Sequence, residues 1–155
     1  MVSEDETLEK SDEHKNIILS DSIKEKTLRS ELKGQVLRHL TKDTVVILDG
    51  LNYIKGFRYE LYCASKSVKT TQVTVHCDIS PPTAWAWNES REDGKNKWSK
   101  ETFDALVMRY EVSSSSKVAP DMNRTLFEGV NQGIIVKYPY PTIFLVSRLM
   151  KSCCE

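Results

Sequence analysis

Apolar runs and helical stripes divide residues 1–112 into alternating strands and helices. Residues 44–48, TVVIL, form a short apolar run without polar alternation, which is typical of a strand buried on both faces of a parallel sheet. Residues 71–77, TQVTVHC, predict a second parallel strand. A helix from Gly56 is predicted by a stripe at three- and four-residue spacing: Phe57, Leu61, Ala64 and Val68. We therefore expect residues 44–77 to form a right-handed βαβ unit.

Three further helices follow from the same kind of pattern. Residues 22–40 carry a core stripe and open with Ser22 and Glu25, a capping-box signature. A short helix over 83–91 follows two prolines, which suit a helix start. Ser99 is expected to cap a helix that runs to Glu111. Helices that alternate with buried strands predict an α/β domain with a parallel sheet and flanking helices.

The pattern changes after residue 112. Four serines at 113–116 form a low-complexity patch, and the apolar residues of 133–155 are interrupted by Lys137 and two prolines. That segment is too short and interrupted to span a membrane. We expect residues 1–112 to form the domain and 113–155 a divergent, partly flexible tail. The end of this tail packs as a strand with a short helix, or it does not fold.

Net charge and cysteine content exclude few classes of function. Lysine plus arginine equals aspartate plus glutamate at 22 each, so a nucleic-acid surface must come from local clustering. The four cysteines form no CxxC pair, which favours a reducing compartment over a zinc site or a disulfide framework. The first ten residues are acidic and polar, unlike a secretory signal or a mitochondrial presequence.

Asp49 is the first candidate for chemistry. It follows the strand at 44–48, and ligands of open α/β sheets bind outside the carboxyl ends of the strands. A carboxylate there suits Mg²⁺ beside a nucleotide phosphate. The alternative is that Asp49 caps the next helix or is a polar residue satisfied within the fold.

A basic and aromatic helix face is the second candidate. Arg58, Tyr62 and Lys69 share one face of the helix that begins at Gly56, and Lys55 and Lys66 lie near it. Cations beside an aromatic ring can hold phosphates or RNA. The alternative is a solvated helix face with ordinary surface lysines.

The run DGLNYIKGFRYELYC at 49–63 resembles the signature of the killer-toxin-insensitivity protein twelve family, the ATPases that accompany the Elongator complex. The resemblance extends to residues 20–49 upstream and to WNESRED and WSKETFDALVMRYE downstream, about two thirds of the chain. It implies a P-loop kinase-like fold, ATP and Mg²⁺ as cofactors, and tRNA-stimulated ATP hydrolysis. It also implies support of wobble-uridine modification in tRNA, with Elongator and tRNA as partners, in the cytoplasm and also the nucleus.

The same resemblance implies roles for individual residues. Arg91 stands in the W-N-x-x-R run, which acts as a lid in P-loop kinases, and an arginine there stabilises the transferring phosphate. Its alternative is a surface ion pair with Glu92 or Asp93. Asp49 becomes the metal-side acid, and Lys55, Arg58, Tyr62 and Lys69 become candidate tRNA contacts.

One part of the family pattern is missing. The chain contains no G-x-x-x-x-G-K-[ST] motif, the loop whose amides and lysine cradle phosphates, and no first strand leading into it. We therefore expect an incomplete fold, an unpaired hydrophobic edge beside the strand at 44–48, and impaired catalysis. Two other functions stay open: an aminoacyl-tRNA or small-substrate kinase of the phosphoseryl-tRNA kinase type, and a non-catalytic binding module.

Overall fold

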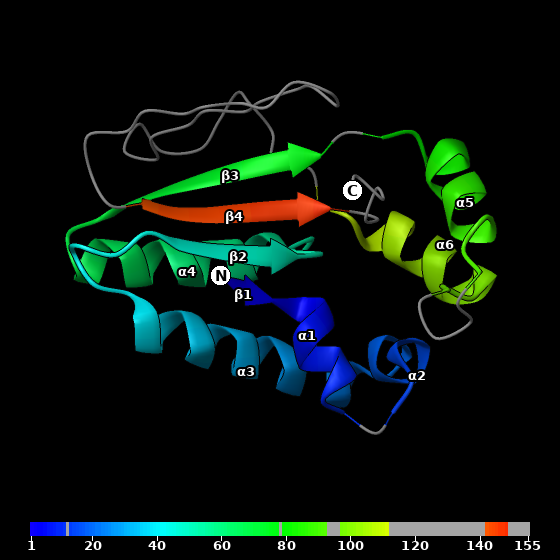
Figure 1. The fold of residues 1–155 in the computed structure, drawn as a ribbon, viewed down its shortest axis with the longest axis horizontal. Helices are drawn as coiled ribbons and strands as arrows, with labels where there is room; N and C mark the ends of the chain where they lie inside the picture. The colour runs from blue at the N-terminus through cyan, green and yellow to red at the C-terminus, as the bar shows by residue number, and fades with distance from the viewer. Residues whose placement is uncertain (12, 78, 93–96, 112–141, 149–155) are drawn as a thin grey trace.

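Four parallel strands form one sheet in the order β1-β2-β4-β3 (Figure 1). The strands are β1 (Val2–Ser3), β2 (Val46–Gly50), β3 (Thr71–Cys77) and β4 (Thr142–Arg148). The computed structural model describes all residues except 12, 78, 93–96, 112–141 and 149–155. Because every pairing is parallel, the carboxyl ends of the strands lie at one edge of the sheet.

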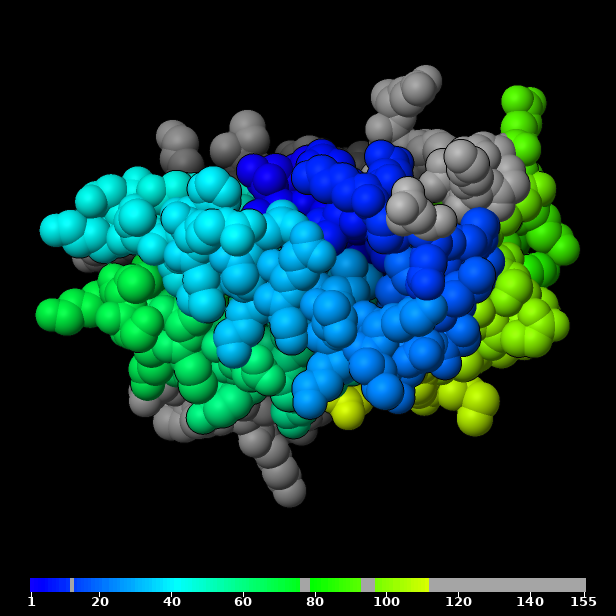
Figure 2. All heavy atoms as spheres, turned by 90° about the horizontal axis from the view of Figure 1, so that it is seen from below, coloured from blue at the N-terminus to red at the C-terminus, as the bar shows by residue number. Residues whose placement is uncertain are grey.

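Helices connect the strands and extend past them. They are α1 (Glu4–Glu9), α2 (Lys15–Ser20), α3 (Ser22–His39), α4 (Lys55–Ser67), α5 (Pro81–Glu89) and α6 (Lys100–Arg109). In Figure 1, α5 and α6 lie beyond the carboxyl ends of the strands, while α4 runs behind the sheet. Figure 2 shows α3 crossing one face of the molecule, flanked by α4 and by the N-terminal elements. None of the described helices combines the length and apolar composition needed to cross a membrane.

The core joins the central strands to the helices around them. Leu48 of β2, Leu61 of α4 and Val36 of α3 are each completely buried. The stripe predicted for residues 22–40 faces this core, since Leu28, Leu32, Val36 and Leu40 are all buried. The 3.6-residue period thus located the buried side of the longest helix.

The predicted elements form, with small differences at their ends. The cap of α3 is Asp21 rather than Ser22, because the Asp21 carboxylate accepts from the N–H groups of Ile23 and Lys24. Ser99 caps α6 as expected, accepting from the N–H of Thr102. β2 ends at Gly50, so Asp49 is the second-to-last residue of the strand and not the residue that follows it.

The expectation of an unpaired edge beside β2 is wrong. β1 pairs with β2 on one side, and β4 pairs with it on the other from Val46 to Gly50. The second partner comes from residues 142–148, inside the expected tail, which form a strand in the interior of the sheet. The remaining residues of that expected tail, including those predicted to be flexible, lie outside the described part of the chain.

The end of α4 is a Schellman motif built around Lys69. The N–H of Lys69 donates to the carbonyl of Lys66 at 3.0 Å, and the N–H of Thr70 donates to the carbonyl of Ser65 at 3.0 Å. This reversal needs a left-handed residue, and Lys69 supplies it with φ of 57°. Glycine is the usual residue there because a Cβ atom is strained in that region.

Replacing Lys69 with glycine is therefore expected to stabilise the protein. Glycine removes the conformational energy of a left-handed lysine from the folded state, and this gain is larger than the entropic cost of a more flexible unfolded chain. Lys69→Gly should therefore raise the free energy of unfolding by about 0.5–1 kcal/mol. Urea denaturation measures the change, and Lys69→Ala is the control because it removes the charge but keeps Cβ. A glycine variant no more stable than the alanine variant would contradict the strain argument.

Candidate functional site

Asp49 lies buried near the carboxyl end of β2, with 7% of its surface exposed. In the sheet it stands between Ser3 of β1 and Val146 of β4. This is the edge at which parallel α/β sheets bind ligands, so the predicted position of the residue is observed. Its role toward a metal stays a prediction.

Glu4 adds a second buried carboxyl group beside Asp49. It is the first residue of α1, and its Oε2 accepts a hydrogen bond from the N–H of Leu51 at 2.6 Å. Burial raises the pKa of Glu4 to about 7, the charges of Asp5, Asp49 and Glu25 add to the rise, and the Leu51 hydrogen bond opposes it. The role of Glu4 was not predicted from the sequence, because an acidic run in a polar N-terminal segment is typical of a solvated chain.

Gly50 lets Glu4 approach the backbone. A Cβ atom at position 50 would stand 2.9 Å from the Cβ of Glu4, closer than two such atoms pack. The glycine that follows Asp49 is therefore required by the carboxyl group that lies against it. This signal was present in the sequence, since glycine near a strand end marks a close backbone approach.

The loop that follows β2 is tied down by its own polar groups. Asn52 has a φ of 43° and donates from Nδ2 to the carbonyl of Leu48 at 3.4 Å. Its own carbonyl accepts from the guanidinium of Arg58 at 2.8 Å. The loop between Asp49 and α4 thus has a defined shape.

Arg58 is not on the solvent-exposed basic face where the helical spacing placed it. Only 6% of its surface is exposed, and the guanidinium donates to the carbonyls of Asn52 and Glu111, the latter at 2.7 Å. Burial lowers the pKa of Arg58, because the charged form loses hydration. The first turn of α4 packs beneath the loop, so its arginine satisfies backbone oxygens instead of facing water.

The other predicted contacts follow the length of α4. Lys55 and Lys69 are exposed at its two ends, about 20 Å apart at 1.5 Å per residue, and Tyr62 is half-buried between them. The Nζ of Lys66 lies 5.4 Å from the centre of the Tyr62 ring, and the Tyr59 ring lies 6.1 Å from it. Lys55, Tyr59, Tyr62 and Lys66 recur at three- and four-residue spacing, so they form one stripe, which we call the α4 stripe.

Arg91 is half-buried and follows α5 in the chain. Helix α5 lies beyond the carboxyl ends of the strands (Figure 1). Asn88, near the end of α5, is buried, with 1% of its surface exposed. The Asn88 amide donates to the carbonyl of Trp98 at 3.0 Å and accepts from the N–H of Trp98 at 2.8 Å. Asn88 of the W-N-x-x-R run therefore ties the end of α5 to Trp98. Arg91 lies between these two residues in the chain.

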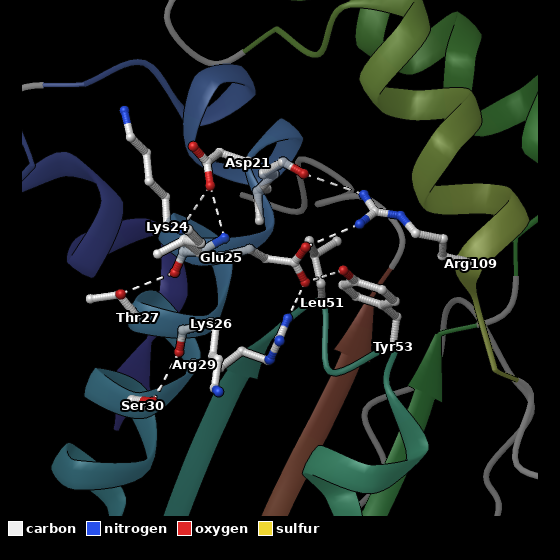
Figure 3. Close-up of polar contacts among 12 residues, drawn as sticks. Asp21, Lys24, Glu25, Lys26, Thr27, Arg29, Ser30, Leu51, Tyr53 and Arg109 are labelled. Atoms are coloured by element: carbon white, nitrogen blue, oxygen red, sulfur yellow. Dashed lines mark hydrogen bonds and ion pairs between the residues drawn. The ribbon is translucent and has the colours of Figure 1, made fainter.

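A buried carboxylate joins the loop to the helices around it (Figure 3). Glu25 of α3 accepts hydrogen bonds from the Tyr53 hydroxyl and from Arg29, and forms an ion pair with Arg109 at 3.0 Å. Arg109 of α6 also donates to the carbonyl of Leu19 at 3.3 Å. Burial and the bond to Glu25 raise the pKa of Tyr53. This cluster holds α3, α6 and the loop after β2 in one arrangement.

A small hollow separates this cluster from Glu4. It has about 20 Å³ of space, enough for one water molecule, and its lining includes Glu4, Glu25, Leu51 and Tyr53. No group of three or more histidine, cysteine, aspartate or glutamate side chains in the described part of the chain could hold a metal ion.

The raised pKa of Glu4 predicts how stability depends on pH. The folded protein keeps the Glu4 proton up to about pH 7, while the unfolded chain releases it near 4.5, so folding loses roughly 3 kcal/mol as pH rises through this window. Glu4→Gln carries no titrating group and should not show this loss. Urea denaturation between pH 4 and 8 measures the difference.

The matched control for this prediction is Glu6→Gln, on the exposed side of the same helix. It should follow the wild-type pH dependence throughout. If wild type and Glu4→Gln have parallel pH profiles, Glu4 is ionised in the folded protein at the same pH as in the unfolded chain.

Curated proteins that resemble the chain are Kti12 homologues. The Protein KTI12 homolog of Xenopus laevis is 46% identical over 101 residues, which are 65% of this chain and 36% of that protein. Protein KTI12 of Saccharomyces cerevisiae is 42% identical over 109 residues, 68% of this chain and 34% of that protein. The matched part therefore spans about a third of the length of these curated relatives.

A solved structure and a family model agree with these relatives. The crystal structure of Chaetomium thermophilum Kti12 in complex with ADP-AlF3 matches with a TM-score of 0.59 and 33% identity, covering 67% of this chain and 57% of that one. This match confirms the P-loop kinase-like α/β class. The family described as chromatin associated protein KTI12 matches residues 1–121. The resemblance seen in DGLNYIKGFRYELYC is thus confirmed, and the chain belongs to the KTI12 family.

Proposed function

We propose that this chain is a nucleotide-binding member of the KTI12 family, whose site lies at the carboxyl ends of β1 and β2. The observation that carries the proposal is the solved relative, which was crystallised with ADP-AlF3 and shares the fold at 33% identity. Asp49 and Glu4 lie close together at the carboxyl ends of the strands, where such folds bind ligands.

The residues present are compatible with Mg²⁺ beside a nucleotide. Magnesium sites of this kind use one or two protein carboxylates, with water and phosphate oxygens completing the octahedron. Asp49 would be the ligand, and the bound ion would neutralise charge on the phosphates. Glu4 holds the backbone of Leu51, so it fixes the loop that begins one residue after Asp49. Arg91 is the candidate contact for the transferring phosphate from the α5 side.

The phosphate-binding loop itself is not among the 155 residues, which contain no G-x-x-x-x-G-K-[ST] motif. Phosphoryl transfer depends on positioning and electrostatic stabilisation, and that loop supplies much of both. We therefore expect ATP hydrolysis only when this loop is supplied, and support of a partner complex without catalysis when it is not.

Calorimetry with Mg²⁺-ATP tests the nucleotide site. The 155-residue chain should bind ATP more weakly than micromolar, and a version extended ahead of Met1 by the strand and phosphate-binding loop of a relative should bind and hydrolyse it. In the extended version Asp49→Asn should lower Mg²⁺-dependent hydrolysis at least tenfold with the fold retained, because the ion loses its protein ligand.

Asp43→Asn is the control, an exposed aspartate in the turn before β2. Micromolar binding by the unextended chain would show that other residues cradle the phosphates. An Asp49→Asn rate equal to wild type would remove Asp49 from the site. Release of inorganic phosphate indicates an ATPase, whereas a labelled acceptor indicates a kinase of the phosphoseryl-tRNA kinase type.

We further propose that the protein acts on tRNA with Elongator, in support of wobble-uridine modification, in the cytoplasm and the nucleus. The α4 stripe supports the tRNA part, since it combines exposed lysines with two tyrosine rings at a helix beside the candidate site. Lys69 extends the same surface at the end of α4. Arg58 is left out of the proposed contacts because its guanidinium is buried on two carbonyls.

Substitution of the lysines tests this surface. If Lys66 and Lys69 contact phosphates, the Lys66→Ala, Lys69→Ala double variant should bind tRNA more weakly, and its slope of log affinity against log salt should fall by about 0.7–0.9 for each lost contact. Fluorescence titration between 50 and 300 mM salt measures both quantities.

The control is a Lys26→Ala, Lys42→Ala double variant, which removes two exposed lysines from α3 and the turn after it. It changes net charge equally and should leave the slope unchanged. Equal slopes for the two double variants would mean that the α4 stripe is a solvated helix face.

A further inference from the structure

The position between β2 and β3 in the sheet is occupied by a strand that comes from a distant part of the chain. β2 and β3 are consecutive strands joined through α4, yet they do not pair with each other. Each pairs with β4 instead: Val46 to Gly50 face Ile143 to Ser147, and Thr71 to Cys77 face Thr142 to Arg148. Two strand spacings of about 4.8 Å therefore separate β2 from β3. We call this position the acceptor slot.

The strand in the acceptor slot comes from a distant part of the chain. The family model matches residues 1–121, which include both walls of the slot, whereas β4 begins at Thr142. Thirty residues, 112–141, separate β4 from the last residue described before it. β4 runs parallel to both of its neighbours, so no hairpin joins it to either of them, and its register is given by its pairing with the two walls.

An empty slot would be costly for the protein. The facing edges of β2 and β3 would present unpaired N–H and C=O groups in the middle of the sheet. The walls therefore accept an extended segment that runs parallel to both, and the segment 142–148 meets that requirement through backbone pairing. Nothing in this pairing depends on the strand belonging to the same molecule.

We propose that the acceptor slot is a strand-exchange site, at which the 142–148 segment of a second copy of this chain can replace the molecule's own β4. A second copy is the partner because its segment has the same register on both walls, so reciprocal exchange keeps every strand pairing of the sheet. The inference concerns assembly and does not depend on the proposed nucleotide function.

The balance between the two arrangements follows from concentration. A strand tethered in the same chain has an effective concentration on the order of 1 mM, about a hundred times a protein concentration of 10 μM. Exchange should therefore be rare in dilute protein and should increase in proportion to concentration. Disabling the tethered strand removes the competitor and should favour the strand of the second copy.

Disulfide trapping tests the exchange on full-length chains in which the native cysteines are replaced by serine. Thr71 and Thr142 are register partners, and Cα atoms on paired parallel strands lie within disulfide range. One chain carries Thr71→Cys and the other Thr142→Cys, and the two are refolded together before oxidation. A single chain with both changes reports occupancy by its own strand as a cross-linked monomer.

Adding Val146→Pro to the Thr71→Cys chain disables its own β4, because proline removes a ladder hydrogen bond from an interior strand. The cross-linked dimer should then rise at least tenfold over the pair without proline. Without the proline, dimer yield should rise about tenfold between 10 and 100 μM protein. Ser147→Cys replaces Thr142→Cys in the control, since residue 147 pairs with His76 at the other end of β3.

Each outcome decides the proposal. In-register dimers that increase with concentration, and with the proline, support exchange. A cross-linked monomer from the double-cysteine chain without dimers from the mixed chains at any concentration shows a slot closed to a second copy, and overturns it. Equal dimer yields from the Ser147→Cys control would also overturn it, because the contact would then lack the register of the sheet.

Discussion

The contact between the Glu4 carboxyl group and the backbone of Leu51 determines where the candidate site can form. It joins the first helical residue of the chain to the loop that follows β2, and it brings a second carboxyl group beside Asp49. The rest of that loop depends on similar internal bonds, from Asn52 to Leu48 and from Arg58 to Asn52. Because these polar groups are satisfied within the protein, Asp49 is held at the sheet edge before any ligand arrives.

Two clamps extend this order to the elements beyond the sheet. Glu25 gathers Tyr53 and Arg109, so α6 and the loop share one buried carboxylate. Asn88 closes the connection after α5 with paired amide bonds to Trp98. The carboxyl end of α5 and that of α6 are thus each fixed by buried polar contacts, and Arg91 follows α5 three residues after Asn88. Removing one partner of either clamp would leave a buried polar group unpaired, which costs about 1–3 kcal/mol.

Local pattern predicted most of the elements, because apolar period and capping residues act over a few positions. It located the buried stripe of α3, the strand at 71–77 and the strand-end position of Asp49. It failed where a long-range contact decided the outcome. Arg58 reads as a surface residue by helical spacing, but the loop above it supplies two carbonyls. The pairing of β2 with β4 joins Leu48 to Leu145, and no local signal links residues so far apart.

Gly50 has a consequence for how this sequence can vary. Its missing side chain leaves the space into which Glu4 fits, although the two residues lie 46 positions apart. Any side chain at position 50 would have to displace Glu4, and a displaced Glu4 would release the backbone of Leu51. Positions 4 and 50 are therefore expected to vary together, since a side chain at position 50 is tolerated only after a smaller residue has replaced Glu4.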